Sequence, residues 1–260
     1  MDDILSRIVK DKRAEVEENK IKHPLASFAD RIAKSDRDFK EAIRKQEKIN
    51  LIAELKFSSP AKNQKIIPTK KQIEQIAQLY NKYAKAISVI TDEKYFGGSP
   101  EYLKIVRKNT DVPVLRKDFI IDKYQVYESG LIGADAILLI ASVLEINEIN
   151  EFLEVARSLN MDCLVEAHTV EDIEKVLHTK AGIIGINNRN LKNMEIDLDT
   201  TIGLAKKISG DILVVSQSGI KTKKDIEYVG GANVDAVLVG TSIMENFGSK
   251  GMEEKLKELS

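Results

Sequence analysis

The feature that most constrains this chain is a repeated alternation between short β-branched runs and longer amphipathic stretches. The runs that we expect to form strands are Leu51–Lys56, Ala86–Thr91, Val112–Lys117, Ala134–Ile140, Asp162–Glu166, Gly182–Asn187, Asp211–Ser216 and Asp235–Gly240. Eight strands that each lead into a helix are the pattern of a closed parallel barrel. We therefore predict an α/β fold of the (β/α)8, or TIM-barrel, type.

The stretches between these runs show helical periodicity, for example KKQIEQIAQLYNKY and EINEINEFLEVARSL. The runs AILLI and DAVLVG are apolar almost throughout, which suits strands that are buried on both faces. A doubly wound open sheet is the main alternative. The absence of a GxGxxG turn and the eight strand–helix units favour the closed barrel.

Residues 1–48 precede the repeat and form a helical pattern of their own. Apolar residues recur at helical spacing from Ile4 to Val16, Asp3 is a candidate cap, and a second short helix is expected near Phe39–Arg44. We predict one barrel domain over residues 1–260, in which residues 1–48 are an N-terminal extension that covers one end of the barrel.

Composition narrows the possible partners. The 260 residues include 40 basic and 41 acidic ones, so no overall field attracts nucleic acid or an anionic membrane. No apolar run approaches the roughly 18 residues of a membrane span, and the first residues lack the apolar core of a secretory signal. We expect a cytoplasmic protein, a monomer or weak homo-oligomer, that acts on a small molecule.

Cysteine and histidine give no sign of a metal or a disulfide. The single cysteine, Cys163, lies in an apolar run and is expected to be a small buried hydrophobic residue. The three histidines have no metal-ligand spacing, so we expect no metal site.

Charged and amide side chains gather at the carboxyl ends of the predicted strands, where barrels of this type carry their function. They are Glu54, Lys56, Lys117, Glu166, Asn187 and Arg189. Glu54 and Lys56 are two positions apart and share a face, so they point into the barrel if Leu55 and Phe57 pack against the helices. Any one of these residues has a structural explanation as a solvated strand end or an ion pair. Their common position favours an acid–base site.

Glycine-containing turns follow the last two predicted strands. In many barrels the loops at these positions bind phosphate through backbone N–H groups and the start of a short helix. Ser218-Gly219 and Gly240-Thr241-Ser242 fit this use, and Ser242–Asn246 is the expected short helix. Ser59-Pro60, after the first predicted strand, adds a hydroxyl group. An ordinary turn is the alternative, since glycine is common after strands.

Several segments also resemble a known family. IAELKFSSPAKN, PVLRKDFI, LVEAH, IGINNRNL, SQSGI and VLVGTSIM are similar, in this order, to signature segments of indole-3-glycerol phosphate synthases. The resemblance covers essentially the whole chain. It implies closure of 1-(2-carboxyphenylamino)-1-deoxyribulose 5-phosphate to indole-3-glycerol phosphate in tryptophan biosynthesis, with loss of CO₂ and water and without a cofactor or metal.

The resemblance also implies roles for individual residues. Lys117 is the general acid on the ketone and Glu166 the proton acceptor in dehydration. Lys56 holds the anthranilate carboxylate and acts as the acid in dehydration, oriented by Glu54. The implied catalytic set is Lys117, Glu166, Lys56, Glu54, Asn187 and Ser218, and the implied substrate-binding set is Arg189, Phe96, Phe119, Leu138 and Gln217. The implied phosphate-binding set is Ser59, Gly219, Gly240 and Thr241.

Elementary chemistry agrees with the main role. The ketone oxygen gains negative charge as the aryl carbon attacks, so a proton donor there lowers the barrier. A lysine serves as this donor if burial and a neighbouring lysine depress its pKa toward the working pH. Two positions depart from the family pattern: Gln217 stands where a glutamate is usual, and Asn63 where a glycine is usual.

Two other functions remain open at this point. A Schiff-base aldolase with Lys117 or Lys56 as nucleophile, or an isomerase, would use the same fold, and borohydride trapping would reveal the aldolase. A non-catalytic phosphate-ligand binder gains some support from Gln217. The intact set of charged residues argues against it.

Overall fold

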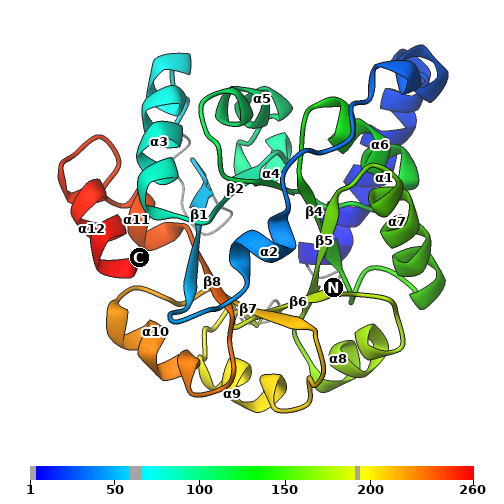
Figure 1. Ribbon diagram of the computed structural model, residues 1–260. Helices are drawn as coiled ribbons and strands as arrows, with labels where there is room; N and C mark the ends of the chain where they lie inside the picture. Colours follow the sequence, from blue (N-terminus) through cyan, green and yellow to red (C-terminus); the bar gives the residue numbers. More distant parts are fainter. Residues whose placement is uncertain (1–3, 59–65, 191–193) are drawn as a thin grey trace.

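In the computed structural model, which describes residues 4–58, 66–190 and 194–260, eight parallel strands close into a barrel (Figure 1). The strands are β1 Asn50–Leu55, β2 Ala86–Ile90, β3 Val114–Lys117, β4 Ala136–Ile140, β5 Asp162–Ala167, β6 Ile183–Asn187, β7 Leu213–Gln217 and β8 Ala236–Val239. Each pairs in parallel with the next, and β8 pairs with β1. The barrel prediction is confirmed, because pairing of β8 with β1 leaves no open edge.

Helices follow the strands and surround the barrel (Figure 1). They are α3 Lys70–Tyr83, α5 Pro100–Lys108, α6 Lys123–Leu131, α7 Ile146–Ser158, α8 Val170–Leu177, α9 Asp199–Ala205, α10 Lys223–Gly230 and α12 Gly251–Leu259. Thr69, Thr169 and Thr222 each begin a helix with a capping box that joins the threonine to a Gln or Asp three residues later. These caps fix where the helices start.

Two four-residue helices lie at the carboxyl ends of strands. They are α4 Glu93–Phe96, after β2, and α11 Thr241–Met244, after β8. The predicted short helix after β8 therefore exists, but it begins one residue earlier than expected and is shorter.

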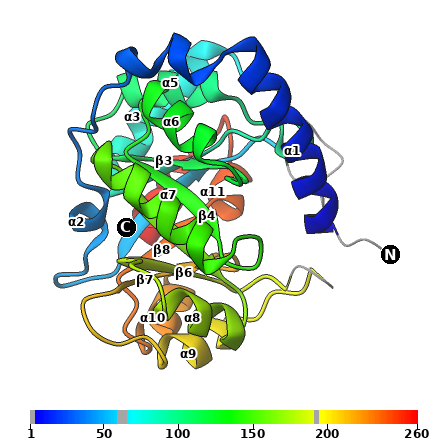
Figure 2. The same cartoon turned by 90° about the vertical axis from the view of Figure 1, so that its right-hand side faces the viewer.

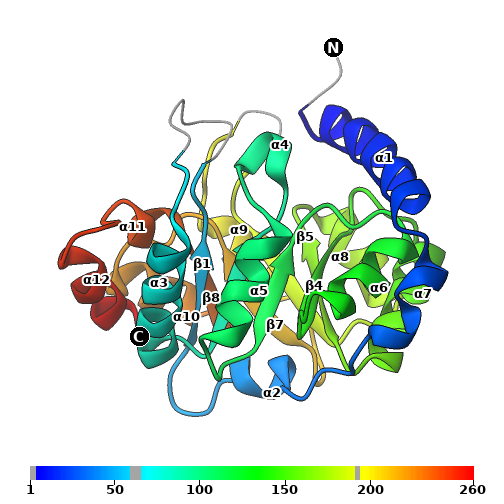
Figure 3. The ribbon, with the colours of Figure 1, turned by 90° about the horizontal axis from the view of Figure 1, so that it is seen from above.

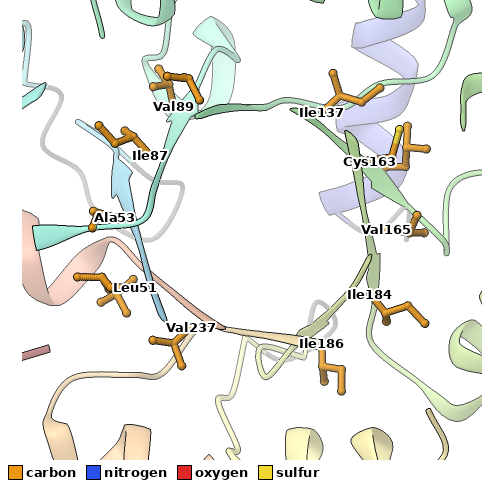
Figure 4. Close-up of a cluster of buried hydrophobic side chains, with 14 of the residues drawn as sticks. Leu51, Ala53, Ile87, Val89, Ile137, Cys163, Val165, Ile184, Ile186 and Val237 are labelled. Carbon is orange, nitrogen blue, oxygen red and sulfur yellow. The ribbon is translucent and has the colours of Figure 1, made fainter. Parts of the chain in front are cut away.

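Side chains of the strands alternate between two buried layers. The outward residues, among them Val89, Val165 and Ile184, point away from the barrel axis toward the surrounding helices (Figure 4). Cys163 is free and lies in this outer layer, as expected, where burial raises the pKa of its thiol. The inward residues, for example Leu164, form a second apolar cluster that fills the barrel. Apolar packing on both faces explains why the strands read as continuous apolar runs.

The N-terminal segment contacts both ends of the barrel, not one end as predicted. Helix α1 (Ile4–Lys22) lies near the carboxyl ends of the strands, and α2 (Phe39–Ile43) lies at the amino ends (Figures 2 and 3). The connection between them includes two 3₁₀ turns, Leu25–Ser27 and Ala29–Arg31. The connection is long enough for α1 and α2 to pack at opposite ends of the barrel.

No helix in the described ranges is long and apolar enough to cross a membrane.

Helix α2 closes the amino end of the barrel. Phe39 and Ile43 are fully buried and belong to the inner cluster. The carboxylate of Asp162, at the start of β5, accepts a hydrogen bond from the Lys40 N–H at 2.9 Å. The aromatic ring therefore acts as a plug that keeps water from the inner cluster.

We predict that Phe39→Ala lowers the free energy of unfolding by about 3–5 kcal/mol, because it leaves a cavity in a fully packed layer. Denaturation in guanidinium chloride measures this. Ile21→Ala is the control, since Ile21 is 80% exposed on α1, and a change of about 0.5 kcal/mol or less is expected there. A loss for Phe39→Ala as small as that of the control would contradict the plug.

Candidate active site

A cavity of about 390 Å³ opens at the carboxyl ends of the strands. The residues predicted for the site that line it are Glu54, Lys56, Phe96, Lys117, Phe119, Leu138, Glu166, Asn187, Arg189, Gln217, Ser218, Gly219, Gly240 and Thr241. The remaining predicted residue, Ser59, lies outside the described residues, as does Asn63. The fold therefore brings together side chains that are spread over most of the sequence.

Lys117, Glu166 and Asn187 form the polar centre of the cavity. The Lys117 Nζ lies 3.3 Å from the Glu166 Oε2, and the Asn187 side-chain amide donates to the Glu166 Oε1 at 3.1 Å. Glu166 is only 4% exposed, whereas the side chain of Lys117 keeps 20% of its surface open. A lysine and a carboxylate this close can pass protons to and from a bound molecule.

The charge state of Lys117 depends on two carboxylates. Burial alone would lower the pKa of Lys117, but the carboxylates of Glu166 and Glu54 outweigh burial and raise this pKa above its usual value. A depressed pKa, which burial and a neighbouring lysine would cause, is therefore not found here, because opposite charges dominate the surroundings. Lys117 is protonated at neutral pH and has a proton to donate.

Glu166 is held in the ionised form by the same contacts. Burial alone would raise its pKa, but the charges of Lys117 and His168 and the hydrogen bond from Asn187 lower the pKa below the usual value. Without a bound molecule, the site thus pairs a protonated Lys117 with an ionised Glu166.

A second charged pair lies at the end of β1. The Lys56 Nζ is 3.2 Å from the Glu54 Oε1 and donates to the Thr241 hydroxyl at 3.1 Å. Glu54 occupies the space beside Gly240, where a Cβ would collide with the carboxylate. Glycine at 240 is therefore needed to make room for Glu54, in addition to any contact of its backbone with a phosphate.

The turn after β7 has an unusual backbone. Ser218 and Gly219 both have positive φ, 65° and 88°, and a Cβ on Gly219 would collide with Ile196. Asn188 holds this turn, since its buried side-chain amide donates to the Ser218 carbonyl at 3.0 Å and to the Ser216 hydroxyl at 3.0 Å. The sequence analysis missed Asn188, which stands beside the predicted Asn187.

Two hydrogen bonds hold Arg189 at the edge of the cavity. Its backbone N–H donates to the Asn187 side-chain oxygen at 3.0 Å, and its guanidinium donates to the Met194 carbonyl at 3.2 Å.

Among the described residues, no group of His, Cys, Asp and Glu is arranged to hold a metal ion.

One wall of the cavity is apolar. Phe96 and Phe119 lie with ring centroids 6.1 Å apart, and Leu138 lines the same cavity. Helix α1 adds Ile4 and Ile8, which the sequence analysis did not assign to the site. Their helical spacing was visible in the sequence, but nothing in it showed that one end of the stripe faces a cavity.

Gln217 is the most unusual polar group of the cavity. It is 2% exposed, and neither atom of its amide has a hydrogen-bond partner within the described part of the chain. The amide occupies the space above Gly185, where a Cβ would collide with its nitrogen. A buried polar group without a partner is costly, so this amide is available to a bound molecule.

His168 was also missed as a site residue. Its Nε2 lies 3.3 Å from the Glu166 Oε1, and its Nδ1 lies 3.9 Å from the Asp172 carboxylate. The signal was present, because LVEAH places the histidine two residues after Glu166 and on the same face.

A closed parallel barrel with its acid–base groups and its cavity at the carboxyl ends of the strands has the layout of a (β/α)8-barrel enzyme. Comparison with known proteins narrows this class. The model of the family described as "Indole-3-glycerol phosphate synthase" matches residues 5–259. The chain belongs to this family.

Similar proteins from other organisms carry the name of the same family. An indole-3-glycerol phosphate synthase from Endomicrobium trichonymphae is 47% identical over 222 residues, which are 85% of this chain and 84% of that protein. The enzyme of that name from Alkaliphilus metalliredigens is 42% identical over 259 residues, which are 98% and 97% of the two chains.

Solved structures share the fold at low identity. The crystal structure of a 3-hexulose-6-phosphate synthase has a TM-score of 0.64 and 16% identity, and the match covers 81% of this chain and 98% of that one. A mutant tryptophan synthase alpha-subunit from Pyrococcus furiosus has a TM-score of 0.61 and 16% identity, with 81% and 97% covered. These likenesses support the barrel fold alone.

We predict that His168→Asn raises the pKa of the Glu166 carboxyl, because it removes one of the charges that lower this pKa. Titration of the side-chain carboxyl carbon by NMR measures the shift. His178→Asn is the control, since His178 is exposed and caps α8 away from Glu166. An unchanged Glu166 titration in both variants would show that His168 does not act on it.

Proposed function

We propose that this protein is an indole-3-glycerol phosphate synthase. It closes 1-(2-carboxyphenylamino)-1-deoxyribulose 5-phosphate to indole-3-glycerol phosphate, with loss of CO₂ and water, in tryptophan biosynthesis. The observation that carries the proposal is the meeting of Lys117, Glu166 and Lys56 in one cavity of a chain that belongs to this family over residues 5–259.

Lys117 and Glu166 perform the proton transfers. As the aryl carbon attacks the ketone carbon, Lys117 donates its proton to the oxygen, which becomes a hydroxyl group. Loss of CO₂ then leaves its electron pair in the ring system. In dehydration Glu166 takes a proton from the intermediate, and Lys56 supplies the proton with which the hydroxyl leaves as water.

The other side chains bind and orient the substrate. Lys56 also holds the anthranilate carboxylate until CO₂ leaves, oriented by Glu54. Phe96, Phe119 and Leu138 pack against the aromatic ring. Asn187 and Ser218 complete the catalytic set, and Arg189 and Gln217 contact the reacting end. The phosphate-binding residues are Ser59, Gly219, Gly240 and Thr241.

The proposal extends to the setting of the enzyme. The chain is one barrel domain with residues 1–48 as its helical extension, and the reaction needs no cofactor or metal. The near-neutral balance of 40 basic and 41 acidic residues supports a small phosphorylated substrate rather than nucleic acid. A cytoplasmic location, the lack of a membrane partner, and a monomeric or weakly oligomeric state stay predictions.

The alternatives have less support. A Schiff-base aldolase needs a neutral lysine amine as nucleophile, but the raised pKa of Lys117 keeps that group protonated. A non-catalytic binder is less well supported, because Lys117 lies 3.3 Å from Glu166 inside the cavity, where the two groups can exchange protons with a bound molecule. Gln217 leaves that central pair intact.

We predict that the purified protein turns over the carboxyphenylamino substrate and that Lys117→Ala slows ring closure by about 10²–10⁴-fold, the usual value of a general acid. The chain has no tryptophan, so the fluorescence of the indole product rises on a low background. Lys123→Ala is the control, because Lys123 is exposed on α6 and pairs with Glu151.

A wild-type protein that binds the substrate without producing indole would overturn the proposed function. Near wild-type turnover of Lys117→Ala would leave the reaction in place but remove Lys117 from it.

We predict that Gln217→Glu changes kcat or KM by no more than about tenfold, or roughly 1.4 kcal/mol. Proton transfer rests on Lys117 and Glu166, and position 217 only supports them. Steady-state kinetics of both proteins decide the matter. An inert wild type that the substitution makes active would mean that the carboxylate is essential and that this chain is a binder.

A further inference from the structure

Lys12, on helix α1, has an environment that the proposed reaction does not explain. Its side chain is 2% exposed, and its Nζ lies 3.1 Å from the Asp92 Oδ2, 3.1 Å from the Asp118 Oδ1 and 3.0 Å from the Glu15 Oε2. Burying an ammonium group is costly unless carboxylates surround it, and here three do. The cluster joins α1 to two carboxylates that follow β2 and β3.

Both buried carboxylates hold the backbone of an aromatic residue of the cavity. The Asp92 Oδ1 accepts the Phe96 N–H at 3.1 Å and thereby caps α4. The Asp118 Oδ1 accepts the Phe119 N–H at 2.8 Å. Phe96 and Phe119 form the apolar wall, so Lys12 bridges the two carboxylates that set the position of its two rings.

The two carboxylates are not held equally well without Lys12. Asp118 also accepts the Thr91 hydroxyl at 2.5 Å and pairs with Arg116 at 3.2 Å, and Arg116, Lys12 and Thr91 together lower its pKa to about 2. Within the described residues, Lys12 is the only cation that forms an ion pair with Asp92. Loss of Lys12 therefore frees α4 and Phe96 more than it frees the strand end that carries Lys117.

Helix α1 takes part in the same wall. Ile4, Leu5 and Ile8 line the cavity together with Phe96 and Phe119, and Lys12 follows Ile8 by one helical turn. Figure 3 shows α1 and α4 at the same end of the barrel. Residues of both helices line the cavity. The ion cluster thus fixes two apolar surfaces of one cavity at once.

We propose that Lys12 is a positioning residue for the aromatic-ring end of the substrate. By joining Asp92 to Asp118 it holds Phe96 against Phe119 and holds α1 beside them. Lys12 does not touch the reacting atoms and acts through this wall. The inference rests on the proposed function, because it assigns a ring-bearing substrate to the cavity.

The test compares Lys12→Met with Lys20→Met. Lys20 also lies on α1 and also ties the helix to the barrel, through Asp122 at 2.7 Å, but it contacts no residue of the wall. Two ligands separate the ends of the substrate: indole-3-glycerol phosphate carries a ring and phosphate, and glycerol 3-phosphate lacks the ring. Isothermal calorimetry gives the affinity for the first ligand, and competitive inhibition gives that for the second.

For Lys12→Met we expect KM and the Kd of indole-3-glycerol phosphate to rise about tenfold or more, since small displacements of positioning groups have large effects. The inhibition constant of glycerol 3-phosphate stays unchanged, and kcat falls by less than KM rises. Lys20→Met matches the wild type in every measurement.

Three results would overturn the inference: equal weakening of both ligands, an effect on kcat alone, or a Lys12→Met protein that behaves like Lys20→Met. Should Lys12→Met fail to fold by circular dichroism, Asp92→Asn replaces it. The amide oxygen still caps α4 while the charge that ties it to Lys12 is lost, so the same ring-selective weakening is expected. If the wild type makes no indole, the proposed function fails first, and this result is distinct from all of these.

Discussion

Lys117 and Glu166 face each other from β3 and β5, and neither charge would be stable in this barrel alone. Each offsets the cost of burying the other, and Asn187 satisfies the second carboxylate oxygen. The pair forms only if the strands close in the observed register, in which Lys117 lies beside Ile90 and Glu166 beside Ile140. The place of the site therefore depends on the strand pairing that also builds the core.

Strand alternation made much of this arrangement predictable. Leu55 and Phe57 pack in the outer layer while Glu54 and Lys56 line the cavity, as their two-residue spacing indicated. The starts of strands were less well predicted. The run beginning at Ala134 becomes a strand only at Ala136, and just before it the Asp135 carboxylate accepts a hydrogen bond from the Val114 N–H of the neighbouring strand. A side chain that bonds across strands cannot be recognised from its own sequence neighbours.

The features that the sequence did not reveal depend on contacts between distant segments. The raised pKa of Lys117 comes from Glu166 and Glu54, which lie on two other strands, so the residues at the end of β3 do not by themselves give the direction of the shift. Likewise, the spacing of Ile4 and Ile8 predicts a helix but not the cavity that they line. Local patterns thus give the elements and the direction of side chains, whereas charge states require the three-dimensional neighbours.

Gln217 affects both the charge of the cavity and the hydrogen bonds that are available in it. Of the charged side chains predicted for the site that line the cavity, Lys56, Lys117 and Arg189 are cations, and Glu54 and Glu166 are anions. The lining also includes Lys221 and the carboxylates of Asp92, Asp118 and Glu245, which makes four cations and five anions in all. A glutamate at 217 would add a further negative charge to a cavity whose proposed substrate carries a carboxylate and a phosphate, and glutamine avoids this repulsion. The cost is a buried amide that finds its partners, if at all, only in what binds there.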